Sequence, residues 1–154
     1  MYRRILVAIE NSPADRTILM HVSKLAGLTG AHLLLVHVAD GWAARNINQL
    51  DLRESEEMKS DREYIEGIAE SLERDGYRAE AILAGGDPAK EIAACAQREN
   101  CDLIAMATHG HRGLSDVLRG SVASELRHIS MLPVLMIRGL PHLHAAPTGP
   151  RPAQ

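Results

Sequence analysis

Five short apolar runs alternate with longer segments of helical periodicity, and this alternation limits the fold more than any other feature. Runs of such length and near-continuous hydrophobicity are typical of strands buried on both faces of a parallel sheet. Helices that connect parallel strands must cover both faces of the sheet. The pattern therefore predicts an α/β fold, a single-domain, Rossmann-like, five-stranded parallel sheet sandwiched by helices. The expected strands cover residues 3–9, 31–38, 77–84, 102–107 and 133–137.

The first two connecting segments carry clear helix signals. Ser12 precedes Pro13, which predicts a helix with Pro13 as its first residue and Ser12 as its N-cap. A long polar helix is expected over residues 52–75, and Gly76 is the residue that ends it. We interpret the acidic residues of this helix as a solvated face. They are Glu54, Glu56, Glu57, Asp61, Glu63, Glu66, Glu70 and Glu73.

The last two connecting segments also have identifiable starts. Asp87 stands directly before Pro88, which predicts a helix that Asp87 caps. Residues 121–130 have the apolar spacing of a final helix, and Gly120 and Ser121 are expected to begin it. The order of elements is therefore β-α-β-α-β-α-β-α-β.

Length and composition agree with one globular domain. A chain of 154 residues with 45% hydrophobic and 24% charged residues is long enough to bury one core without disulfides or metals. We expect the domain to cover residues 1–138. Residues 139–154 hold four of the seven prolines and few core-forming residues, so we expect a disordered tail there.

Several classes of function are disfavoured. The 17 basic residues do not outnumber the 20 acidic ones, and aromatic residues make up only 3%, so we expect no nucleic-acid binding. Apolar runs are too short for a signal peptide or a membrane span, so we expect a cytoplasmic protein. Cys95 and Cys101 lack CxxC spacing and are interpreted as buried thiols. His37, inside an apolar run, is expected to be a partnered core or sheet-edge histidine.

Residues 108–121 connect the fourth strand to the last helix and form the most informative segment. Ligands of parallel α/β folds bind at the carboxyl ends of strands, where helix amides favour anions. Gly110 and Gly113 allow a concave row of N–H donors, Ser121 adds a hydroxyl, and Arg112 adds positive charge. The alternative is a long connection that needs glycines only for turns, with Ser121 as a helix cap. The residues alone predict an anion site.

His109 and His111 in this segment resemble a metal pair only superficially. No carboxylate stands near them in the sequence, so we interpret them as exposed residues and predict no metal site. A divalent cation, Mg²⁺ or Mn²⁺, is expected only together with bound phosphates.

Four motifs in order along the chain resemble the universal stress protein family. The likeness covers about residues 2–138 and implies a fold like that of the adenine nucleotide alpha hydrolases. It also implies binding of ATP or AMP and a dimeric role in stress response. The motifs are Arg4-Ile-Leu-Val-Ala-Ile-Glu10, Leu35-Val-His-Val38, Gly86-Asp-Pro88 and Met106-Ala-Thr-His-Gly-x9-Gly-Ser121.

The nucleotide-binding branch of that family carries the pattern G-x2-G-x9-G-S/T. Gly110, Gly120 and Ser121 match it, whereas Ala107 stands where the first glycine is expected. Glu10 stands where the family usually has aspartate. The resemblance implies that the adenosine end is lined by Ala8, Ile9, Glu10 and Val38, with Met106 beneath it and Ala107 beside it. It implies that the phosphates lie among Gly110, Arg112, Gly113, Gly120, Ser121 and Val122, and that the methyl group of Ala107 lies at the approach to them.

Members of the family commonly pair the last strand across a dimer axis. The resemblance therefore implies a homodimer through the strand that starts at Pro133 and ends at Ile137. Two other functions remain open: a nucleotide-free dimeric scaffold whose site Ala107 narrows, and a slow nucleotide hydrolase or autophosphorylating protein. No motif places a general base beside Ser121, so catalytic residues are not predicted.

Overall fold

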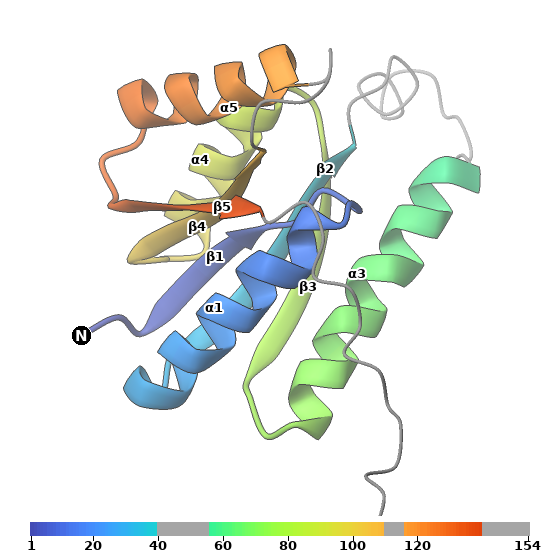
Figure 1. Cartoon of the computed structure of the whole chain (residues 1–154), viewed down its shortest axis with the longest axis vertical. Helices are drawn as coiled ribbons and strands as arrows, with labels where there is room; N and C mark the ends of the chain where they lie inside the picture. Colours follow the sequence, from blue (N-terminus) through green and yellow to red (C-terminus); the bar gives the residue numbers. More distant parts are fainter. Residues whose placement is uncertain (40–55, 110–115, 140–154) are drawn as a thin grey trace, which may run out of the picture.

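The five predicted strands form one parallel sheet in the order β3-β2-β1-β4-β5, which confirms the fold class (Figure 1). The computed structural model describes residues 1–39, 56–109 and 116–139. Each strand begins and ends within two residues of its predicted bounds. The strands are β1 Arg4–Ala8, β2 His32–Ala39, β3 Ala79–Gly85, β4 Leu103–His109 and β5 Val134–Gly139.

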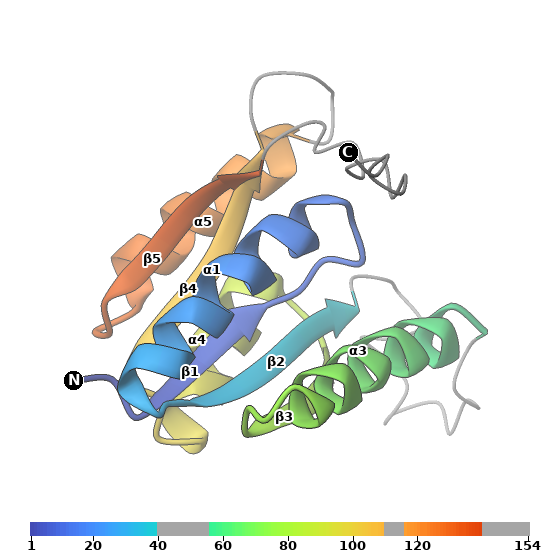
Figure 2. The same ribbon diagram turned by 60° about the horizontal axis from the view of Figure 1, so that its bottom comes forward.

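Four helices in the described residues cover the two faces of this sheet. On one face lie α1 and α3, and on the other lie α4 and α5 (Figures 1 and 2). None of these helices is both long enough and apolar enough to cross a membrane. Their bounds are Ala14–Thr29 for α1, Glu56–Arg74 for α3, Pro88–Arg98 for α4 and Asp116–Ile129 for α5.

Alternate residues of each central strand enter two separate cores, because side chains in a strand point to opposite faces in turn. In β1, Ile5 and Val7 pack with α1 and α3, whereas Leu6 and Ala8 pack with α4 and α5. We refer to these two sets of buried residues as the α1/α3 core and the α4/α5 core. A nearly continuous apolar strand is what two-sided burial requires, and this explains the sequence of β1.

Two predicted helix ends are confirmed. Gly76 follows α3 with a φ of 91°, a left-handed conformation that glycine adopts without strain. Asp87 caps α4, and its side chain accepts a hydrogen bond of 3.1 Å from the backbone N–H of Lys90. Residues 40–55, which include the predicted start of α3, lie outside the described part of the chain.

The predicted start of α5 is wrong. The helix begins at Asp116, five positions before the predicted Ser121, so Gly120 and Ser121 lie inside it. Gly120 has the residue type of a helix boundary, but one glycine inside a helix costs only about 1 kcal/mol. Neighbouring leucine and arginine residues favour the helix and offset that cost.

The predicted start of α1 is also shifted. The helix begins at Ala14, and Pro13 occupies the cap position without a side-chain hydrogen bond. Ser12 still contributes, because its hydroxyl accepts a hydrogen bond of 3.3 Å from the N–H of Ala14. The acidic residue of the first turn, Asp15, is buried and holds this turn in a way described below.

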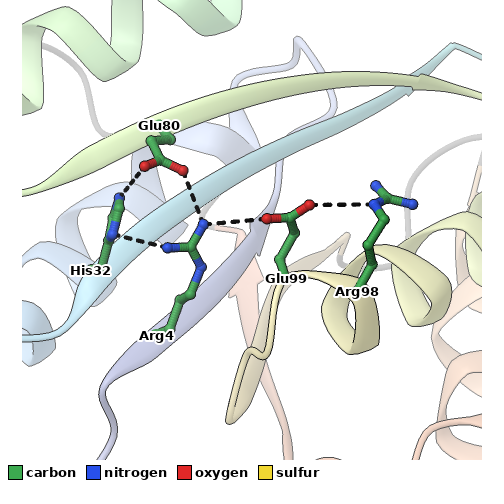
Figure 3. A network of polar contacts seen from close by, with 5 residues as sticks. All are labelled: Arg4, His32, Glu80, Arg98 and Glu99. Carbon is green, nitrogen blue, oxygen red and sulfur yellow. Dashed lines mark hydrogen bonds and ion pairs between the residues drawn. The ribbon is translucent and has the colours of Figure 1, made fainter.

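A polar network stabilises the amino-terminal end of the sheet (Figure 3). One guanidinium nitrogen of Arg4 donates to Nδ1 of His32 over 3.1 Å, and another lies 2.9 Å from Glu80 and 3.5 Å from Glu99. Burial lowers the pKa of His32, although the nearby Glu80 opposes this effect. The imidazole is therefore neutral, as it must be to accept a hydrogen bond from arginine.

Candidate functional site

The strand order reverses between β1 and β4, and the carboxyl ends of strands at such a reversal are where open α/β sheets bind ligands. The chain proceeds from β1 to β2 and β3 on one side, and then crosses to β4 and β5 on the other. In open α/β sheets such a reversal separates the connecting loops and leaves a crevice outside the strand ends. Glu10 follows β1 at this point, and residues 110–115 follow β4.

Four apolar residues predicted to contact a nucleotide gather on one side of this crevice. Ala8 and Met106 are partners in the register of β1 with β4, and both are buried in the α4/α5 core. Val38, near the end of β2, and Val122, in α5, are partly buried and pack against the same core. Three strands and one helix thus bring residues far apart in the sequence to one apolar wall.

Ile9 and Ala107 are placed differently from these four. Each is 3% exposed and belongs to the α1/α3 core on the opposite face of the sheet. A ligand on the α4/α5 side would meet their backbone rather than their side chains. The methyl group of Ala107 is therefore buried in the core and does not project on the side of Met106.

Glu10 brings a carboxylate to the same end of the sheet. Its side chain is half-buried, and its Oε2 accepts a hydrogen bond of 3.2 Å from the Ser12 hydroxyl. Its backbone N–H donates to Asp15 over 2.9 Å. The side chain and the backbone N–H of Glu10 are therefore both held by contacts within the β1–α1 segment.

Asp15 organises the turn between β1 and α1, a role that the sequence analysis did not foresee. Its side chain is 1% exposed, and its two oxygens accept hydrogen bonds from the N–H groups of Glu10 and Ser12 and from the Tyr64 hydroxyl. Burial, and secondly the negative charge of Asp15, raise the pKa of Tyr64 to about 12. Tyr64 therefore stays protonated as a donor at neutral pH.

A second set of contacts holds the same turn from α3. Nδ1 of His37 lies 2.8 Å from the carbonyl oxygen of Ile9, and its Nε2 lies 3.2 Å from Oδ2 of Asp61. The Asn11 amide donates to Oδ1 of Asp61 over 2.9 Å.

The prediction of a partnered histidine at position 37 is confirmed. The interpretation of Asp61 as part of a solvated face is wrong, since its side chain is 13% exposed.

The predicted phosphate end is described only in part. Gly110, Arg112 and Gly113 lie outside the described residues, as do the side chains of residues 116–120. Ser121 is exposed on α5. Because α5 begins at Asp116, the N–H groups of Gly120 and Ser121 lie beyond the first turn, where amides bond within the helix. The N–H groups open to an anion are therefore those of the first residues of α5.

Two further observations concern other kinds of site. An open cleft of about 530 Å³ lies between α1 and α3, on the opposite side of the sheet from the apolar wall, and Asn11, Ser12, Arg16 and Tyr64 are among its lining residues. Among the described residues, no group of three or more histidine, cysteine, aspartate or glutamate side chains is arranged to hold a metal ion.

Comparison with known proteins places this chain beside one family. Residues 1–138 match the model of the universal stress protein family. Universal stress protein MJ0577 of Methanocaldococcus jannaschii is 30% identical over 90% of this chain and 96% of its own length. Its solved structure superposes with a TM-score of 0.70 at 29% identity over the same shares of the two chains.

Two other solved universal stress proteins share the fold and were determined with nucleotides. One, from Archaeoglobus fulgidus and in complex with dAMP, has a TM-score of 0.66 at 20% identity and covers 88% of this chain and 98% of its own. The other, in complex with cAMP, has a TM-score of 0.67 at 15% identity and covers 90% of this chain and 98% of its own.

Proposed function

Because the chain belongs to the universal stress protein family, we propose that it binds an adenine nucleotide, ATP or AMP, at the carboxyl ends of β1, β2 and β4. The observation that carries this proposal is the apolar wall formed by Ala8, Val38, Met106 and Val122 with the Glu10 carboxylate near it. Nucleotide sites combine an apolar surface for the base with a few polar groups that fix orientation. Related proteins that hold dAMP and cAMP support the same ligand class.

In this proposal the phosphate groups of the nucleotide lie at the glycine-containing segment and the start of α5. Gly110, Gly113, Gly120 and Ser121 supply the family pattern, and Arg112 supplies a cation. A helix N-terminus favours negative charge, and a divalent cation, Mg²⁺ or Mn²⁺, would bind through the phosphates. When nucleotide is bound, these residues orient it, and the apolar wall excludes water from the base.

In this proposal the protein acts in the cytoplasm as a nucleotide-responsive dimer in stress signalling. Occupancy by ATP or AMP would change the surface that a partner meets, without rapid turnover. Slow hydrolysis or autophosphorylation is the alternative, and it would show as turnover of ATP well above background. A scaffold that binds no nucleotide is the other alternative.

Calorimetric titration with ATP and AMP, with and without Mg²⁺, tests the proposed ligand. We expect micromolar binding by the wild-type protein after co-purified nucleotide has been removed. Glu10→Gln should weaken the affinity by about 10-fold or more, because a hydrogen bond to a charged group contributes about 1.5–3 kcal/mol. Ser121→Ala should lower the affinity for ATP more than the affinity for adenosine.

Glu66→Gln is the matched control, since Glu66 is an exposed carboxylate on α3 and its change should leave both affinities as they are. Absence of heat for every nucleotide with the wild-type protein would contradict the proposed ligand and favour the scaffold.

The proposed dimer uses the edge of the sheet at β5. In the described sheet β5 pairs only with β4, so its other edge has backbone groups available for a second copy. Apolar side chains lie exposed on and near it: Met136 is 39% exposed and Met131 is 92% exposed. We expect light scattering at micromolar concentration to give the mass of a dimer, and Met136→Lys to shift the population to monomer. A monomeric wild-type protein under these conditions would overturn the proposed interface.

A further inference from the structure

The turn between β1 and α1 presents Glu10, and side chains from three elements contact the backbone of this turn or the side chain of Asn11. From α1, the carboxylate of Asp15 accepts hydrogen bonds of 2.9 and 3.0 Å from the N–H groups of Glu10 and Ser12. From β2, His37 contacts the carbonyl oxygen of Ile9 at 2.8 Å. From α3, Asp61 contacts Asn11 at 2.9 Å. The position of the Glu10 carboxylate therefore depends on groups distant in the sequence.

Asp61 is the member of this set that joins two of the contacts. Its Oδ1 accepts from the Asn11 amide, and its Oδ2 lies 3.2 Å from Nε2 of His37. The side chains of His37 and Asp61 are only 12% and 13% exposed, so water screens their contact weakly. One carboxylate thus holds the turn both directly and through the histidine.

Both ring nitrogens of His37 face groups that accept hydrogen bonds. Its Nδ1 faces a carbonyl oxygen and its Nε2 faces a carboxylate, and both of these groups only accept hydrogen bonds. A neutral imidazole has one N–H, so both contacts are hydrogen bonds only when the ring is an imidazolium. The contact with Asp61 is then a charge-assisted hydrogen bond.

Asn11 shows why the turn needs this support. Its φ is 59°, in the left-handed region that few residues other than glycine adopt. Asparagine tolerates this conformation better than most side chains, but the chain must still be held in it. The hydrogen bond to Asp61 is the contact that fixes the side chain of Asn11 in the described structure.

From these contacts we infer that Asp61, acting through His37 and Asn11, is a positioning residue for the nucleoside end of the ligand site. Asp61 sets the turn that presents Glu10, and nucleotide affinity is therefore coupled to the docking of α3. Tyr64 lies one helical turn beyond Asp61 and holds Asp15, so α3 supports the turn at two points. This inference rests on the proposed nucleotide site.

Two measurements on Asp61→Ala test the inference. We expect amide hydrogen exchange within residues 9–12 to become about 10-fold faster, while exchange in β4 stays as in the wild type. We expect the affinity for AMP to fall about 10-fold, whereas the affinity for pyrophosphate, which lacks the nucleoside, should not change. Glu66→Ala removes an exposed carboxylate from the same helix and should alter neither quantity.

Asp61→Asn separates a positioning role from a merely structural one. The asparagine oxygen accepts from Asn11, and its amide donates to Nε2 of a neutral His37, so this variant needs the uncharged ring. We therefore expect Asp61→Asn, unlike Asp61→Ala, to keep the protection of residues 9–12 and most of the affinity for AMP.

The outcomes distinguish this inference from the proposed function. Wild-type protein that binds neither AMP nor pyrophosphate would contradict the proposed function, and the exchange rates would still show whether Asp61 holds the turn. Asp61→Ala that keeps both its AMP affinity and its protection at residues 9–12 would overturn the inference while leaving the nucleotide site intact. Asp61→Asn that loses as much affinity for AMP as Asp61→Ala would show that the hydrogen bonds of this side chain do not position the turn.

Discussion

Replacing Asp15 with alanine should lower the free energy of unfolding by about 3 kcal/mol. The carboxylate is 1% exposed and accepts from two backbone N–H groups and the Tyr64 hydroxyl. Each buried donor left without a partner costs about 1–3 kcal/mol, and removal of the buried charge offsets part of the sum. Urea unfolding followed by circular dichroism measures the change.

Two further variants make this result specific to the hydrogen bonds of Asp15. Asp15→Asn keeps the shape but replaces one acceptor oxygen with a donor, so we expect an intermediate loss. Asp75→Ala, at an exposed position after α3, should change the stability by less than about 0.5 kcal/mol. A loss below about 1 kcal/mol in Asp15→Ala would show that water replaces the three contacts and that the turn is not held by Asp15.

The two cysteines should react with a thiol reagent at least about 1,000-fold more slowly in the native protein than in the unfolded chain. Cys95 is 1% and Cys101 is 6% exposed, and neither forms a disulfide. Burial raises the pKa of Cys95, and it raises the pKa of Cys101 to about 11 against the opposing effect of Arg4. The reactive thiolate is therefore scarce, and the reagent reacts only with molecules in which the structure has opened around the cysteines.

Labelling with a chromogenic disulfide at pH 8, in buffer and in guanidinium chloride, measures this ratio. Ser60→Cys supplies an exposed thiol on α3 as an internal reference, which should react at the unfolded rate in the native protein. Fast native labelling of the wild type would show that the α4/α5 core opens readily near Cys101.

The fold could be predicted because strands that are buried on both faces need nearly continuous apolar runs, and these runs are visible in the sequence. Residues of β1 such as Leu6 and Val7 are apolar in succession because each enters a different core. Gly76 and Asp87 fixed helix ends through chemistry confined to a few neighbouring residues. The start of α5 was misplaced because Gly120 resembles a boundary, while the helix tolerates it.

The candidate site could be predicted only where its residues belong to a contiguous motif or to the end of a strand. Glu10 was found because it ends the first family motif, just after a predicted strand. Asp61 was missed because it is one of many acidic residues in a polar helix, and only the packing of α3 brings it to His37. Asp15 has no signal in the sequence beyond its place near a helix start, since its contact with Tyr64 spans 49 positions of sequence.

The close approach of Gly139 to Ala14 joins two regions that have different roles. A Cβ atom at Gly139 would lie 3.1 Å from the Cβ of Ala14, closer than ordinary contacts allow. Gly139 ends the edge strand, and Ala14 begins the helix that carries Asp15. A side chain at position 139 would therefore require Ala14 to move or to become glycine. A substitution at the end of the sheet edge would in this way shift the start of the helix whose Asp15 holds the turn that carries Glu10.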